Sequence, residues 1–91
     1  MTETEAAWWV DGLKVRTLRG ARELSIRQLA RQAQIVEPTL NRLERSSGPG
    51  RMTWPPIVVA VAAVLGVSAE ELIEGDLDAF RADLERLRLK P

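Results

Sequence analysis

Apolar residues recur along most of the chain at spacings of three and four, and the strict alternation typical of strands is missing. Glycine and proline interrupt the pattern at only a few points, among them residues 48–50, 55–56, 66 and 75. Alanine, leucine, arginine and glutamate dominate the intervening segments, and all four favour helices. The pattern predicts an all-α chain: a compact five- to six-helix bundle with an added C-terminal amphipathic helix.

Two capping boxes indicate where helices begin. Ser25 and Gln28 stand three residues apart, so each side chain can accept a hydrogen bond from the other's backbone N–H. Ser68 and Glu71 repeat this spacing. With the glycine and proline positions, they predict a first helix over about 8–22, a second from 25, a third over about 37–45, a fourth from 55–56 to 65–66, a fifth from 68 and a sixth over about 77–89.

The fourth predicted helix has no polar residue between Ile57 and Leu65. A surface helix normally carries a polar stripe. This helix is therefore either enclosed on every side or placed at a subunit interface. We favour the interface, with Val59 and Ala63 in it.

The last predicted helix carries a hydrophobic seam formed by Leu77, Phe80, Leu84 and Leu87, at spacings of three, four and three. Two heptads are too short to be stable alone. The seam must therefore dock on the chain's own Trp8–Trp9 region or on a partner's equivalent helix. In a parallel pair, Asp83 of one chain would approach Arg88 of the other, which favours dimerisation. We divide the chain into residues 1–75 and this docking element, 76–91.

The two short helices before the loop have the spacing of a helix-turn-helix. A set of spaced residues makes the resemblance specific: Leu18-Arg19, Leu24-Ser25, Gln28-Leu29-Ala30, Ile35, Pro38-Thr39-Leu40, Arg42-Leu43-Glu44-Arg45, Leu65-Gly66-Val67-Ser68 and Glu71-Leu72. Over roughly residues 13–73 the chain resembles the phage-repressor/Cro-like (Xre-like) helix-turn-helix family. That resemblance implies a DNA-binding transcription regulator of bacterial or phage type.

The third helix would then be the recognition helix, whose outer face enters the major groove. Asn and Arg are suited to bidentate contacts with adenine and guanine. A carboxylate at the helix start can accept from cytosine or simply complement the helix dipole. The expected base contacts come from Glu37, Pro38, Thr39, Asn41 and Arg42.

Backbone contacts and one internal ion pair complete the expected site. Helix ends and basic loops position DNA-binding proteins on phosphates without reading sequence. We expect such contacts from Arg27, Gln28, Arg45, Ser46 and Arg51. The resemblance also implies an ion pair between Arg19 and Glu44, which would contribute little if both charges were exposed. We expect a solvated role for Arg22 and Arg31.

Three positions depart from the family pattern. Gln34 occupies a turn position that is commonly glycine, which implies strain or a shifted turn. Ile26 stands where a phosphate-binding polar residue is frequent, and it can instead pack on a partner. The loop over residues 46–54 is longer than usual.

Composition narrows the chemistry. The chain has no cysteine, histidine or tyrosine, which excludes thiolate and histidine metal sites and the common nucleophile–base pairs. We expect no enzyme activity, no metal and no cofactor. The acidic N-terminus is unlike a secretory signal, and the apolar run of eleven residues is too short to span a membrane. We therefore expect a cytoplasmic protein.

The zero net charge conceals a strong asymmetry. Residues 12–52 contain nine basic and three acidic side chains, a net charge of +6, and the flanks carry −6. A basic middle segment suits binding to phosphates. The leading interpretation is a repressor that binds a palindromic operator as a homodimer. Two alternatives remain: an antitoxin that neutralises a protein toxin, and an interaction module that has lost DNA binding.

Overall fold

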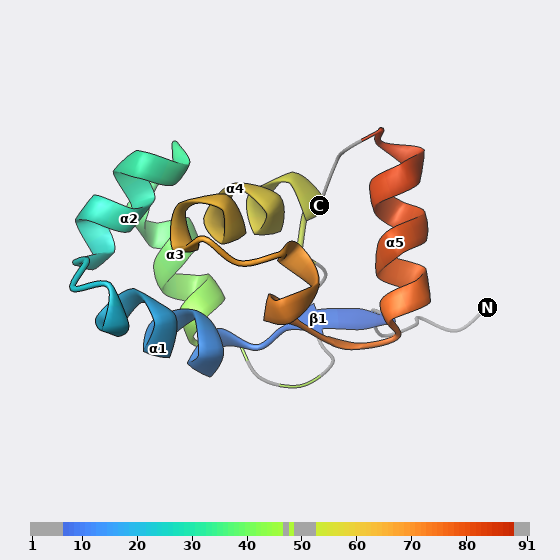
Figure 1. Cartoon of the computed structure of the whole chain (residues 1–91), viewed down its shortest axis with the longest axis horizontal. Coiled ribbons are helices and arrows are strands. Elements are labelled where there is room, and N and C mark those ends of the chain that lie inside the picture. Colours follow the sequence, from blue (N-terminus) through green and yellow to red (C-terminus); the bar gives the residue numbers. More distant parts are fainter. Residues whose placement is uncertain (1–6, 47, 49–52, 89–91) are drawn as a thin grey trace.

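The computed structural model describes residues 7–46, 48 and 53–88. Within them the chain forms five α-helices, one 3-10 turn and a two-stranded sheet (Figure 1). The elements in order are β1 (Trp8–Val10), α1 (Gly12–Ala21), α2 (Ile26–Ala33), α3 (Glu37–Glu44), α4 (Pro55–Leu65), η1 (Ala69–Leu72), β2 (Ile73–Gly75) and α5 (Leu77–Arg86). The molecule is elongated, 43 × 24 × 20 Å. The predicted helical bundle is confirmed, and the small sheet is an addition to the all-α fold that the sequence predicts.

The helices α1 to α4 surround a core of fully buried aliphatic side chains. This core explains why four helices of only 8–11 residues are stable together, since each would be marginal alone. Its most buried members from these helices are Val15, Leu29, Leu40, Val58, Val61 and Leu65.

The second helix begins and ends as the sequence predicts. Ser25 Oγ accepts a hydrogen bond from Gln28 N at 3.0 Å, and Gln28 Oε1 accepts one from Ser25 N at 2.8 Å. Gln34 ends the helix in the left-handed conformation, with φ 61° and ψ 42°. The turn is therefore not shifted, and a non-glycine residue adopts a backbone conformation that costs roughly 1 kcal/mol.

The first helix starts later than predicted. Residues 8–10 form β1, and α1 begins at Gly12, with the Asp11 side chain accepting a hydrogen bond from Lys14 N. β1 pairs antiparallel with β2, Trp8 opposite Gly75 and Val10 opposite Ile73. The strand alternation spans only three residues, Trp8 and Val10 being buried and the residue between them half-buried. So short a pattern carries no periodic signal.

The predicted fifth helix is a single 3-10 turn, η1, followed directly by β2. Ser68 N donates to Glu71 Oε2 at 3.2 Å, so the cap was identified correctly. The chain does not continue as an α-helix because residues 73–75 pair with β1, more than sixty residues away in the sequence.

The apolar helix α4 is mostly enclosed by its own chain. Val58, Val61, Ala62 and Leu65 are buried, whereas Val59 is half-buried and Ala63 is exposed. α4 packs against α2, η1 and α5. Packing within one subunit therefore largely explains why α4 has no polar stripe. A narrow apolar face of the helix is left uncovered.

The last helix, α5, docks on β1 of its own chain, which is the first of the two alternatives. The rings of Trp8 and Phe80 meet edge to face, with centroids 4.8 Å apart and planes at 74°. Trp8 Nε1 donates to Asp83 Oδ2 at 2.7 Å. α5 thus contributes to the core of the domain. The division of the chain between residues 75 and 76 stays a prediction.

An ion pair joins α5 to η1. Arg81 reaches Glu70 with Nε at 2.6 Å and Nη2 at 2.9 Å. This hydrogen-bonded pairing lowers the pKa of Glu70 and raises the pKa of Arg81. The Arg81 side chain is therefore engaged within the chain. In the described part of the chain, no helix is long and apolar enough to cross a membrane.

Candidate nucleic-acid interface

The recognition helix α3 is held in place by its inner face. Leu40 is fully buried and Leu43 nearly so, and both belong to the same core as Leu29 and Ala30 of α2. The small side chain of Ala30 suits a position where two helices pack closely. This packing fixes which side of α3 points outward.

The outer face of α3 carries the residues predicted to contact bases. Glu37, Pro38, Asn41 and Arg42 are exposed, and Thr39 is half-buried. Glu37, Asn41 and Arg42, whose side chains are of types that hydrogen-bond to base edges, therefore lie exposed on a helix whose opposite side is packed in the core. We call this surface, residues 37, 38, 39, 41 and 42, the recognition face.

An ion pair anchors the end of the recognition helix to α1. Arg19 binds Glu44 in a two-pronged arrangement, Nε to Oε2 at 2.7 Å and Nη2 to Oε1 at 3.0 Å. The third guanidinium nitrogen donates to the Leu24 carbonyl at 3.0 Å. The hydrogen bond to Glu44 raises the pKa of Arg19.

The predicted ion pair is confirmed. It is not exposed, so the small contribution expected of an exposed pair does not apply to it. The side chains of Arg19 and Glu44 are only 18% and 5% exposed. A pair so placed is desolvated, and losing one partner leaves the other charge without compensation. The pair therefore holds the orientation of α3 against α1 more firmly than a surface pair can.

A close backbone approach adds to this anchor. A β-carbon at Gly12 would lie 2.5 Å from the carbonyl oxygens of both Leu43 and Glu44. Real side chains do not tolerate such a distance, and the obstructing atoms are backbone atoms that cannot move aside. The start of α1 can therefore approach the end of α3 this closely only because residue 12 is glycine.

The residues predicted to contact phosphates lie around the recognition face. Arg27, Gln28 and Arg45 are exposed, and Ser46 is half-buried with its Oγ donating to the Arg42 carbonyl at 3.2 Å. Arg27 Nε lies 3.6 Å from Glu37 Oε2, in an ion pair that is open to solvent and therefore weak. The fifth predicted residue, Arg51, lies outside the described residues.

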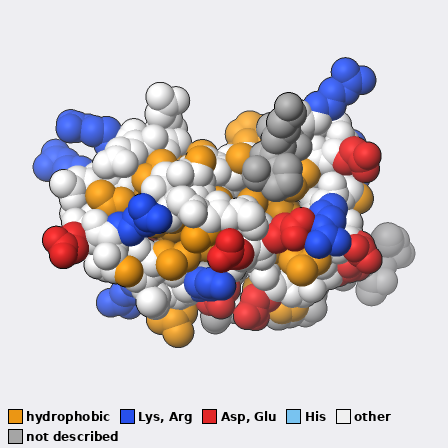
Figure 2. All heavy atoms as spheres, in the orientation of Figure 1, with side chains coloured by type: hydrophobic (Ala, Val, Ile, Leu, Met, Phe, Trp, Pro, Cys, Tyr) orange, Lys and Arg blue, Asp and Glu red, His pale blue; other side chains and the backbone are white. Residues whose placement is uncertain are grey.

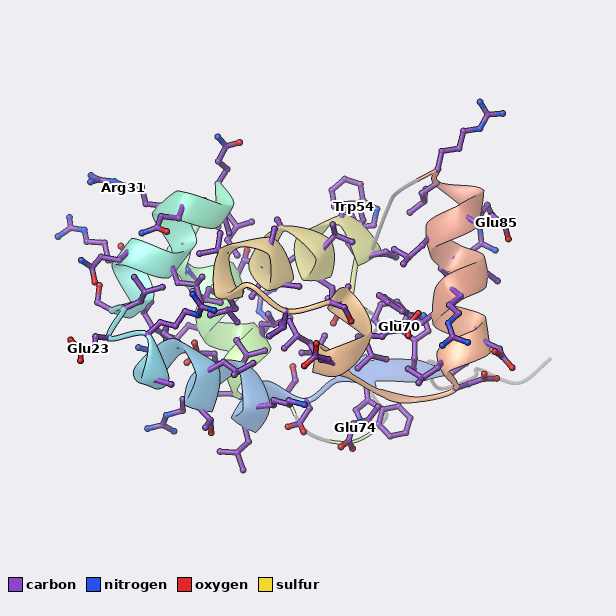
Figure 3. All side chains as sticks on the ribbon, in the orientation of Figure 1. Glu23, Arg31, Trp54, Glu70, Glu74 and Glu85 are labelled. Carbon is purple, nitrogen blue, oxygen red and sulfur yellow. The ribbon has the colours of Figure 1, made fainter. Side chains whose placement is uncertain are left out.

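Charges separate along the length of the molecule. Figure 2 shows lysine and arginine side chains over the end formed by α1 and α2, and acidic side chains gathered with fewer arginines over η1 and α5. In Figure 3, Arg31 projects outward from the α2 end, where Glu23 is the one labelled acidic residue, whereas Glu70 lies beside η1, Glu74 below β1 and Glu85 on α5. The basic segment seen in the sequence is thus a basic end of the folded molecule.

Arg22 is exposed, in agreement with its predicted solvated role, and its guanidinium also lies against the end of α4. A β-carbon on Gly66 would meet its guanidinium nitrogen at 2.5 Å, so the Arg22 head lies on Gly66. Gly66 caps α4 in the left-handed conformation, at the end of the helix where the dipole is negative. A cation there complements the dipole.

The residues predicted at a dimer interface fall into two groups. Phe80 and Leu84 are buried in the core of their own chain, so the predicted seam with a partner's helix is wrong for these two in this fold. Asp83 likewise binds Trp8 and Arg86 of its own chain. The other group remains accessible at least in part: Val59 and Leu77 half-buried, Ala63 and Leu87 exposed.

The sequence did not single out one accessible residue next to the recognition face. Val36 precedes the recognition helix and is 64% exposed, the second most exposed large apolar side chain in the described part of the chain. The signal available was its position directly before a predicted helix start. Ile26, by contrast, packs against the core of its own chain.

Comparisons with known proteins agree with this architecture. A family model described as "Helix-turn-helix domain" matches residues 12–74. A sequence search of curated proteins gave no match.

Three solved structures are similar. SinR, described as the master regulator for biofilm formation and solved in complex with DNA, has a TM-score of 0.55 and 25% identity, over 65% of this chain and 90% of that one. The SinR–SinI complex has a TM-score of 0.59 and 24% identity, over 86% of this chain and 74% of that one. The clp gene regulator ClgR from Corynebacterium glutamicum has a TM-score of 0.58 and 19% identity, over 85% of this chain and 74% of that one.

The family match runs from the start of α1 into β2 and includes both helices of the motif, α2 and α3. The resemblance to phage-repressor-like proteins is confirmed by this match and by the shared fold. The chain belongs to the helix-turn-helix domain family, as a protein of the DNA-binding transcription-regulator type.

Proposed function

We propose that this chain is a repressor that binds a palindromic operator as a homodimer, with α3 in the major groove. The observation that carries the proposal is the recognition face. It presents Glu37, Asn41 and Arg42 outward on a helix that the core and the Arg19–Glu44 pair hold rigidly. Preorganised polar groups on a fixed helix are what direct base readout requires.

The first test is selection of bound sequences from a random duplex library. We expect a preferred site of two inverted half-sites whose centres lie about one DNA turn apart, roughly 34 Å. Recovery of an asymmetric site would contradict the homodimer, and recovery of no preference would contradict the proposed function itself.

Arg42 supports base readout because it is exposed on the recognition face, in the last turn of α3. Replacing Arg42 by alanine is expected to reduce the free energy of binding to the selected site by about 1–3 kcal/mol. Preference should relax at one base position in each half-site. If the binding free energy fell equally for selected and random DNA, Arg42 would be assigned to phosphate contacts instead.

Arg27 and Arg45 support phosphate contacts because both are exposed beside the recognition face. Replacing either by glutamine is expected to weaken binding to all sequences. It should also flatten the slope of log K against log salt by about one unit. Arg86→Gln, at the α5 end, is the matched control and should leave the slope unchanged. An unchanged slope for both interface variants would remove them from the phosphate contacts.

The uncovered face of α4 supports the homodimer. Val59 and Ala63 stand four residues apart and so lie on one side of the helix, where a partner copy can pack. In a twofold dimer the same face meets itself, so a charge introduced there meets its own copy.

Replacing Ala63 by glutamate is therefore expected to weaken the dimer at least about tenfold in sedimentation equilibrium, because it buries two like charges. Ala82→Glu places the same charge on an exposed position of α5 and should leave the dimer intact. If both variants dimerise as the wild type does, the interface lies elsewhere.

An antitoxin is the second candidate. Trp54, directly before α4, and Leu87, directly after α5, are large apolar side chains that are exposed and do not belong to the recognition face. Tryptophan is enriched among the residues that dominate binding at protein interfaces. Similarity to SinR in its complex with SinI also supports a protein partner. A gene for a small toxin adjacent to this one, and a stable complex of the two purified proteins, would favour this candidate.

A further inference from the structure

We infer that Val36 is a specificity residue that contacts the 5-methyl group of a thymine. The inference rests on the proposed function, since it requires α3 to enter the major groove. It adds a residue to the recognition face and specifies the base that this residue prefers.

The side chain of Val36 has no evident role in the fold. Val36 is the N-cap of α3, with φ −79° and ψ 149°, and its side chain makes no capping hydrogen bond. It is 64% exposed and does not belong to the hydrophobic core of the described residues. Serine, threonine, aspartate and asparagine are the residues that favour this position.

The local backbone explains why an apolar residue is tolerated there. Pro38 has no N–H to satisfy, and the Thr39 N–H already donates to the Val36 carbonyl at 3.1 Å. A polar N-cap side chain usually accepts a hydrogen bond from one of these two amides, and here neither amide has an N–H left without a partner. The start of α3 needs no polar cap, but it does not need an exposed valine either.

The placement of Val36 matches a reading position. The N-terminal residues of a recognition helix are those that reach base edges. Val36 directly precedes Glu37 and Pro38, and the residue before it, Ile35, packs toward the core. The thymine methyl is the apolar group that the major groove offers. A branched aliphatic side chain with no polar atom fits that group and no other base edge.

The test uses the preferred duplex obtained from library selection. Each thymine of that duplex is replaced in turn by deoxyuridine, which removes the methyl group and leaves base pairing intact. For the wild-type chain we expect one thymine in each half-site whose replacement raises Kd about fourfold, the value of one buried methyl group. For Val36→Ala we expect binding to the thymine duplex to be at least about fourfold weaker. We also expect no further loss on the deoxyuridine duplex.

Two variants serve as controls. Leu13→Ala removes an apolar side chain that is 69% exposed on α1, outside the recognition face, and should retain the wild-type response to deoxyuridine. Val36→Ser should respond as Val36→Ala does, with Tm within about 3 °C of the wild type because the position is exposed. Agreement of the two Val36 variants separates base contact from any change in helix capping.

Each other outcome overturns the inference in a distinguishable way. If Val36→Ala retains the deoxyuridine penalty, or if no thymine is sensitive in the wild type, Val36 does not read a methyl group and the proposed function still stands. If the variant retains that penalty and in addition binds both duplexes more weakly by the same factor, Val36 contacts the sugar or only supports the backbone. If the wild type selects no sequence at all, the proposed function fails and the inference fails with it.

Discussion

Replacing Phe80 by alanine is expected to lower the free energy of unfolding by about 3–5 kcal/mol, a large part of the stability of a domain this size. Phe80 is fully buried, and its ring packs on Trp8 with centroids 4.8 Å apart. The truncation removes this aromatic contact and leaves a cavity between α5 and β1. Urea denaturation should show the loss, and Tm should fall by at least about 12 °C.

Leu87→Ala is the matched control for this experiment. Leu87 lies just after the same helix but is 42% exposed, so its removal should change the free energy of unfolding by less than about 1 kcal/mol. A small effect of Phe80→Ala would contradict docking of α5 on its own chain. It would revive the alternative in which the seam pairs with a partner's helix.

Replacing Glu44 by alanine is expected to lower the free energy of unfolding by about 3 kcal/mol, since it leaves the Arg19 side chain, which is only 18% exposed, without its countercharge. The Leu24 carbonyl is the acceptor that remains. Because Glu44 ends the recognition helix, we also expect weaker binding to DNA in the same variant. Chemical denaturation and a duplex titration measure the two effects.

The double variant Arg19→Met, Glu44→Leu distinguishes a buried pair from a surface pair. Apolar residues of similar volume can replace a desolvated ion pair with little loss, so the double variant should recover most of the stability lost by Glu44→Ala. A loss below about 1 kcal/mol for Glu44→Ala alone would mean that the pair behaves as an exposed one.

Local sequence signals determine the helix-turn-helix itself. The Ser25–Gln28 capping box, the turn at Gln34 and the start of α3 at Glu37 each depend on residues within four positions of one another. Such short-range hydrogen bonds and helical spacing can be read directly from the sequence. The outward placement of Asn41 and Arg42 follows as well, since burying Leu40 and Leu43 fixes the opposite face of the helix.

Tertiary structure decided the remaining features, because each depends on residues far apart in the chain. The pairing of residues 8–10 with 73–75 joins two strands of three residues, and neither is long enough to show a period of two. Burial of the Arg19–Glu44 pair depends on how closely α1 approaches α3 at Gly12. The apolar seam of α5 predicts that this helix docks on another apolar surface. It does not say which one, since Trp8 of the same chain and the equivalent helix of another copy are both suitable. Its own Trp8 occupies that place because the β1–β2 pairing brings the ring directly against Phe80.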